Sequence, residues 1–91
     1  MLRISENGAS DGKKVVKLEG RVVGACVTEV QVYCEAILSQ GQRLTIDMAG
    51  VSFLDRNGVE LFRQLATQNV LLSNCSPFLN ELLKPAAFEI Q

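Results

Sequence analysis

The sequence contains no histidine, and this absence excludes more functions than any other feature of the composition. Histidine is the usual general base, the usual partner of a nucleophilic serine or cysteine, and the commonest metal ligand. The chain also has no Cys-x-x-Cys pair and no glycine-rich phosphate loop of either common type. We therefore expect a protein that is not an enzyme, with no catalytic residues and no metal or cofactor site.

Long apolar runs and an excess of charge of one sign are missing as well. No run approaches the roughly 18–20 apolar residues that span a bilayer. The N-terminal sequence MLRISENG lacks the apolar region of a signal peptide. A net charge of −1 provides no electrostatic reason to bind nucleic acid or an anionic membrane. These absences predict a cytoplasmic protein without direct membrane insertion and without a nucleic-acid partner.

The three cysteines are an odd number, which does not suggest a disulfide framework. Cys26 and Cys34 fall in one predicted helix, where a rise of 1.5 Å per residue places them about 12 Å apart. A disulfide needs Cα atoms within roughly 7 Å of each other. We expect these two thiols and that of Cys75 to be buried, reduced and structural.

What the chain does have is enough apolar content for one core. It is 91 residues long and 47% hydrophobic, which excludes intrinsic disorder. A chain of this length buries only about 60–65% of the surface that its unfolded form exposes. We therefore expect a single domain that covers residues 1–91.

The first half of the chain predicts a hairpin followed by a helix. Leu2–Ser5 and Lys14–Arg21 are strand candidates, and the small and polar residues of Glu6–Gly12 indicate the loop between them. Apolar residues at three- and four-residue spacing then predict a helix over Ala25–Ser39. Val32 lies off the apolar stripe of that helix and is expected to face solvent.

The next segment predicts a strand, a loop and a second helix. Arg43–Met48 alternates as a strand, with Asp47 expected to bind nearby backbone at its end. Ala49–Leu54 is expected to be a connecting loop held by apolar anchors, Phe53 among them. Asp55 is a good N-cap for the helix that follows. Four apolar residues at helical spacing predict its buried face: Val59, Phe62, Leu65 and Ala66.

The last part of the chain predicts a buried strand over Asn69–Ser73 and a third helix. Ser76 is the expected N-cap and Pro77 the first helical residue. Pro85 ends the helix, and Phe88–Ile90 is either a last short strand or a loose tail. The residues expected on the buried face are Phe78, Leu79, Leu82 and Leu83. The order β-β-α-β-α-β-α predicts an α/β fold, in which three helices cover a mixed sheet of four to five strands.

One segment, Ile46 to Leu61, could carry function. It places Asp55-Arg56-Asn57-Gly58 after a parallel strand, at the edge of the sheet where open α/β folds commonly bind ligands. The spacing alone supports a well-capped helix without another role equally well.

This segment resembles the signature of the STAS domain family, which includes bacterial anti-sigma factor antagonists, stressosome proteins and the cytoplasmic tails of sulfate transporters. The signature reads as an apolar strand, Asp, a small loop, an apolar pair, Asp-Ser-Ser-Gly and an apolar helix. The matching residues are Asp47, Phe53-Leu54, Asp55 and Gly58, with Leu18-Glu19-Gly20 and Leu71–Pro77 resembling flanking parts of the family pattern. The resemblance covers nearly the whole chain and implies the same fold.

The resemblance also implies a function and a departure from it. Family antagonists are phosphorylated by their partner kinase at the first Ser after the second Asp, and here this position is Arg56 and the next is Asn57. The implied function is a non-catalytic interaction module, in bacterial signalling and transcription regulation, that binds an anti-sigma kinase or a sister STAS protein without phosphorylation at this site. The implied partner-binding residues are Asp55, Arg56, Asn57, Gly58, Glu60, Arg63 and Gln64.

Two other functions remain open from the sequence. The chain could be the STAS subunit of a phospholipid-transport ABC transporter, docked on its ATPase. A small-ligand or nucleotide-binding domain is the third hypothesis, although the phosphate loops are missing. The sequence also leaves a homodimer open.

Overall fold

The computed structural model describes residues 2–10 and 12–83 of the chain. Its elements follow the predicted order β-β-α-β-α-β-α, which confirms the fold class. They are β1 (Arg3–Ser10), β2 (Lys13–Val22), α1 (Ala25–Ser39), β3 (Arg43–Leu54), α2 (Arg56–Thr67), β4 (Leu71–Ser73) and α3 (Pro77–Leu83). The predicted helix end at Pro85 and the strand candidate Phe88–Ile90 lie outside the described residues.

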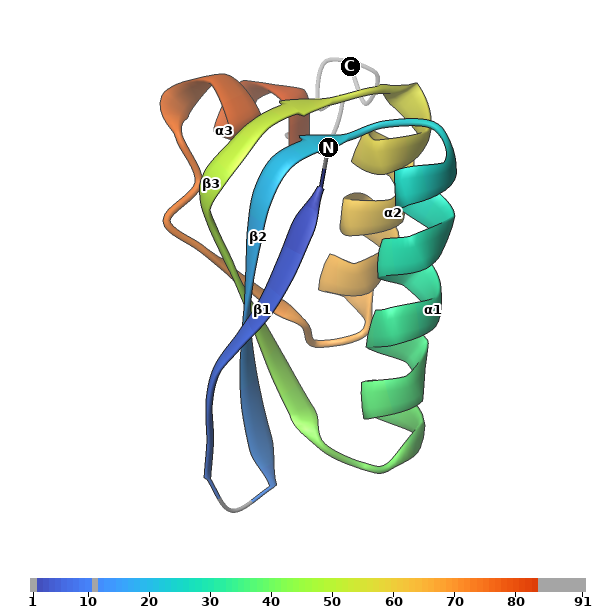
Figure 1. The fold of residues 1–91 in the computed structure, drawn as a ribbon, viewed down its shortest axis with the longest axis vertical. Coiled ribbons are helices and arrows are strands. Elements are labelled where there is room, and N and C mark those ends of the chain that lie inside the picture. Colours follow the sequence, from blue (N-terminus) through green and yellow to red (C-terminus); the bar gives the residue numbers. More distant parts are fainter. Residues whose placement is uncertain (1, 11, 84–91) are drawn as a thin grey trace, which may run out of the picture.

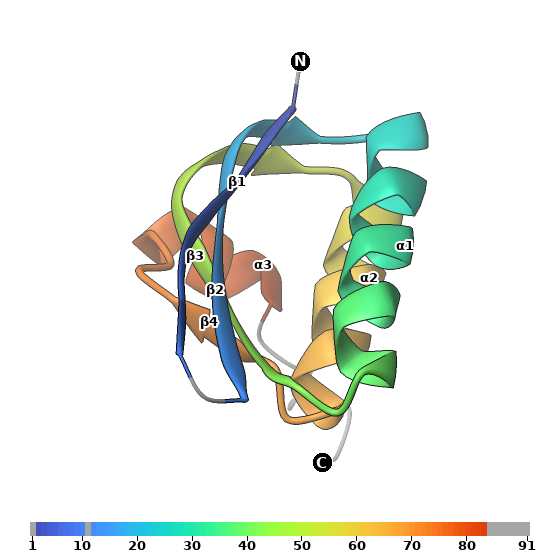
Figure 2. The same ribbon diagram turned by 60° about the horizontal axis from the view of Figure 1, so that its bottom comes forward.

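The four strands form one mixed sheet in the order β1-β2-β3-β4. The hairpin strands β1 and β2 are antiparallel, as expected, whereas β2 with β3 and β3 with β4 are parallel. Parallel neighbours need a long crossover connection, and α1 and α2 provide the two crossovers. Both views show these helices side by side on one face of the sheet, with α3 beside the second half of β3 (Figures 1 and 2).

The core lies between the sheet and the helices. In β3, the alternate residues Leu44, Ile46 and Met48 are at most 1% exposed, which confirms the predicted inward face. The sheet side of the core also includes Val16, Leu18 and Val22 of β2, Val51 and Leu54 of β3, and Val70 before β4. The helices contribute the opposite side: Val27, Val30, Cys34 and Ile37 from α1, Leu61, Phe62 and Leu65 from α2, and Leu79 from α3.

The α1 helix has the predicted bounds, Ala25–Ser39. It is followed at Gly41 by a backbone φ of 77°, the left-handed conformation that favours glycine after a helix. Val32 is 61% exposed and confirms its expected position off the buried stripe.

The sequence underestimated the length of two strands. β1 continues to Ser10 through most of the predicted loop Glu6–Gly12, because β2 offers a full antiparallel partner and a bulge between Glu6 and Gly8 absorbs the irregular register. The predicted loop Ala49–Leu54 is likewise wrong, since β3 keeps pairing with β2 up to its last residue. A Cβ at Gly50 would lie 2.9 Å from the carbonyl oxygen of Leu18, so glycine permits this close approach.

Several side chains differ from their predicted burial. Ala66 is exposed, and Leu61 takes its place on the buried face of α2. Phe53, expected to anchor its loop, is 42% exposed, and Phe78, expected on the buried face of α3, is 51% exposed. The thiols are free, but only that of Cys34 is buried, whereas Cys26 and Cys75 are half-buried. Next to Cys26, Phe53 and Phe78, the following residue is buried, a difference of one position that periodicity alone does not resolve.

Candidate functional site

The Asp55 carboxylate joins the starts of two helices that are distant in the sequence. Its Oδ1 accepts a hydrogen bond of 2.8 Å from the backbone N–H of Gly58, which confirms it as the N-cap of α2. Its Oδ2 accepts a bond of 2.9 Å from the backbone N–H of Gly24, the residue that precedes α1. The sequence predicted only the first of these bonds, because the second requires the ends of β2 and β3 to be adjacent.

Both bonds favour the charged form of this carboxylate. The N–H groups of Gly24, first, and of Gly58 lower the pKa of Asp55 from its ordinary value of 3.8. The carboxylate therefore stays negative at neutral pH, at the N-terminus of a helix, where the helix dipole favours negative charge.

Gly58 fits tightly between α2 and the end of β2. A Cβ on this residue would lie 2.8 Å from the carbonyl oxygen of Val22, closer than side chains approach backbone atoms. The backbone N–H of Asp55 donates to the same carbonyl at 3.3 Å. Glycine at this position thus lets the first turn of α2 contact the sheet directly.

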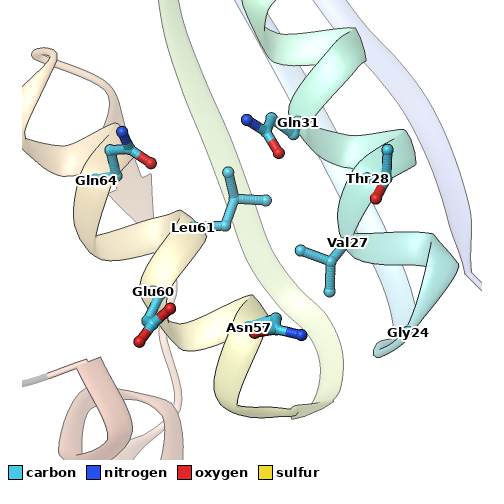
Figure 3. Close-up of a pocket in the computed structure, with 8 residues that line it drawn as sticks. All are labelled: Gly24, Val27, Thr28, Gln31, Asn57, Glu60, Leu61 and Gln64. Carbon is cyan, nitrogen blue, oxygen red and sulfur yellow. The ribbon is translucent and has the colours of Figure 1, made fainter.

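A groove of about 290 Å³ lies between α1 and α2. It begins at Gly24 and Asn57, near the starts of the two helices, and extends along them to Gln31 and Gln64. Figure 3 shows side chains from both helices converging on it. Its lining residues are Gly24, Val27, Thr28 and Gln31 from the α1 side, and Asn57, Glu60, Leu61 and Gln64 from α2. The polar side chains form the rim of the groove. Val27 and Leu61, which are buried and belong to the core, form its floor. The arrangement offers hydrogen-bonding groups on a surface formed by two helices.

The structure brings together only part of the predicted site. Asn57, Glu60 and Gln64 line the groove. Arg56 is exposed as the first residue of α2. Arg63 lies on the other side of α2, where its Nη2 donates to the backbone carbonyl of Leu82 in α3 at 3.3 Å.

The α1 half of the groove was missed by the sequence analysis. Thr28 and Gln31 lie one helical turn apart on the polar face of α1, and Gly24 precedes it with a φ of 56°. A glycine before a helix, followed by polar residues at three-residue spacing, was the available signal. It did not reveal that this face would lie opposite α2.

The other aspartate of the signature, Asp47, has a structural role, because it joins two parts of the backbone. Its Oδ1 accepts bonds from the backbone N–H of Ala49 at 3.0 Å and from the Nδ2 of Asn74 at 3.1 Å. The first contact confirms the predicted bond to nearby backbone. These bonds, that of Ala49 first, lower the pKa of the Asp47 carboxyl. Asp47 therefore fastens the turn after β4 to β3.

Within residues 2–10 and 12–83, no three side chains of His, Cys, Asp or Glu lie where they could hold a metal ion. No helix in the described part of the chain is long and apolar enough to cross a membrane.

Comparison with known proteins identifies the fold. The model of the STAS domain family matches residues 6–89. Among solved structures, the chain is similar to the unphosphorylated form of the anti-sigma factor antagonist SpoIIAA. The TM-score is 0.71 at 17% sequence identity, and the match covers 97% of this chain and 94% of that one. At this identity the likeness shows the fold alone. No curated protein matches the sequence.

Proposed function

Because the chain belongs to the STAS domain family, we propose that it is a non-catalytic module that binds a partner protein with the first turn of α2 and the α1–α2 groove. The observation that carries this proposal is the double hydrogen bond of Asp55, which holds Gly24 and Gly58 on one carboxylate. A surface whose two halves are held in place before binding loses little conformational freedom when it binds.

The chemistry of the groove suits a protein surface. Asn57, Glu60 and Gln64 are exposed and offer both donors and acceptors along the rim. Protein interfaces combine such polar rims with apolar atoms at their centre, here those of Val27 and Leu61.

Arg56 determines how such binding is regulated. We align this residue with the Ser that is phosphorylated in family antagonists, and a guanidinium cannot accept a phosphoryl group from a Ser/Thr kinase. Its positive charge also lies at a helix N-terminus, where the dipole disfavours it. The complex with the partner is therefore not dissociated by phosphorylation at this position.

The partner that best fits is an anti-sigma kinase or a sister STAS protein, since one similar structure is that of an anti-sigma factor antagonist. Co-purification with a transporter ATPase instead of a kinase would favour the transporter-subunit function. Binding of a small ligand or a nucleotide in the groove, with no protein retained, would favour the third hypothesis.

The first experiment maps the surface. The tagged protein is used to capture partners from native extract, which are identified by mass spectrometry, and the variants Glu60→Lys and Gln64→Lys are compared with wild type. We expect both variants to lose the partner. Glu29→Lys is the matched control, because Glu29 is an exposed acidic residue on α1 that does not line the groove. Equal loss in the control, or none in the groove variants, would contradict the proposed surface.

The second experiment tests the regulation. Wild type and Arg56→Ser are incubated with the identified kinase and ATP, and phosphate is mapped by mass spectrometry. We expect phosphorylation and release only for Arg56→Ser. Phosphate anywhere between Val51 and Leu61 of the wild type, with release of the partner, would refute the proposal that phosphorylation in this segment does not dissociate the complex.

A further inference from the structure

Two phenylalanines form an exposed aromatic pair at the carboxyl end of the sheet. Phe53, near the end of β3, is 42% exposed, and Phe78, in the first turn of α3, is 51% exposed. Their ring centroids lie 6.4 Å apart with an angle of 25° between the planes, a stacked arrangement. Figure 1 shows α3 beside this part of β3. Leaving two large apolar side chains in water is unfavourable, and contiguous apolar patches often mark interaction sites.

Two arginines lie close to Phe53, one across the sheet and one along the chain. Arg21 is the direct partner of Phe53 in the parallel pairing of β2 with β3, so the two side chains lie on the same face of the sheet. Their burial agrees, because both are exposed while the next residue on each strand is buried. Arg56 follows Phe53 by three residues and is exposed at the start of α2.

These two guanidinium groups are available to a ligand. Among the described residues, neither Arg21 nor Arg56 has an ion-pair partner. Asp55, the acidic residue closest to Arg56 in the chain, has both carboxylate oxygens occupied by the backbone N–H groups of Gly24 and Gly58. The surface thus combines exposed rings with two guanidinium groups that form no ion pair within the described part of the chain.

We propose that Arg21, Phe53, Arg56 and Phe78, here named the aromatic patch, bind an acidic segment of the partner protein that carries an apolar side chain. The proposal rests on the proposed function, since it adds a second contact beside the α1–α2 groove. Aromatic residues and arginine are enriched where protein interfaces gain most of their binding energy. Guanidinium groups pair with carboxylates in bidentate geometry, and the rings accept the apolar side chain.

The test uses short synthetic peptides as probes. Labelled peptides of four kinds are titrated against the full chain: acidic with a central Leu or Phe, acidic without one, basic with one, and neutral with one. We expect the acidic peptides with an apolar centre to bind most tightly. We also expect Phe78→Ala and Arg21→Glu each to weaken that binding by about tenfold or more.

Matched controls separate specific binding at the aromatic patch from nonspecific hydrophobic and electrostatic binding. Leu71→Ala removes another large apolar side chain, 64% exposed on β4, and Arg43→Glu reverses another exposed arginine at the start of β3. Neither control should weaken the peptide complex as the patch variants do. Phe53→Ser provides a second aromatic variant, and thermal unfolding of each variant shows whether the fold is kept.

Several outcomes would overturn the inference. They are no preference for acidic peptides with an apolar centre, equal weakening by the controls, or the same variant sensitivity for vesicles of anionic phospholipid. The two proposals also fail separately. If Glu60→Lys abolishes capture of the partner while Phe78→Ala and Arg21→Glu do not, the groove stands and the aromatic patch does not. If the patch variants alone weaken capture and peptide binding, the patch stands and the groove does not.

Discussion

Asp55 is hydrogen-bonded to Gly24 over a sequence separation of 31 residues, with 2.9 Å between the Oδ2 of the aspartate and the backbone nitrogen of the glycine. The same carboxylate caps α2 through Gly58. One side chain therefore sets the relative position of the starts of α1 and α2, and with it the mouth of the groove.

Removing the charge of Asp55 should flatten the acid dependence of stability. A carboxyl whose pKa is lowered in the folded state stabilises the protein above its unfolded-state pKa, and this contribution is lost as the pH falls through the folded pKa. Because the pKa of Asp55 is lowered by its bonds from Gly24 and Gly58, the wild type should lose stability as the pH falls below the ordinary range of an aspartate. Asp55→Asn should be less stable than wild type at neutral pH and lose less on acidification. Urea denaturation at a series of pH values measures both, and parallel curves for the two proteins would contradict the prediction.

Gly58→Ala should destabilise the protein although alanine is the better helix former. The helix propensity favours alanine by about 1 kcal/mol. The added Cβ would lie 2.8 Å from the Val22 carbonyl oxygen, and such overpacking costs about 1–3 kcal/mol. We expect a net loss of up to about 2 kcal/mol in the free energy of unfolding, measured by urea denaturation. An increase in stability would mean that α2 moves away from β2 without cost.

Two phenylalanines allow a matched test of the core. Phe62 is fully buried in α2, so Phe62→Ala should lower the free energy of unfolding by about 3–5 kcal/mol. Phe78 is 51% exposed, so Phe78→Ala should cost far less. Thermal or chemical unfolding of both variants checks the order, and similar losses would show that the aromatic pair supports the core.

Cys34 should be the least reactive thiol of those described. It is 1% exposed, and burial, followed by the nearby charge of Glu35, raises its pKa to about 11. Since the thiolate is the reactive form, alkylation of the native protein by iodoacetamide at mildly alkaline pH should be slower at Cys34 than at the half-buried Cys26. Mass spectrometry of digested samples gives the rates. In urea the difference should shrink, and equal native rates would contradict the burial of Cys34.

Features that depend on neighbouring residues were predicted correctly from the sequence. The α1 bounds, the cap at Asp55 and the cap at Ser76, whose Oγ accepts from the backbone N–H of Leu79 at 3.2 Å, were all predicted. Each depends on residues within one helical turn, so local physics decides it. The second half of β3 was not predictable in the same way. Its small residues indicate a loop until the adjacent strand β2 supplies backbone partners.

The sequence by itself determined the order of the elements, the buried face of β3 and the capping residue of α2, because periodicity and capping are read within a few neighbouring residues. Only the tertiary structure decided which surfaces those elements share. Gly24 meets Asp55 because the parallel strands β2 and β3 end side by side. For the same reason α1 supplies half of the groove, and Phe53 stacks on Phe78 outside the core. Such contacts join residues far apart in the chain, and the sheet registers that bring them together are set by the packing of the whole domain.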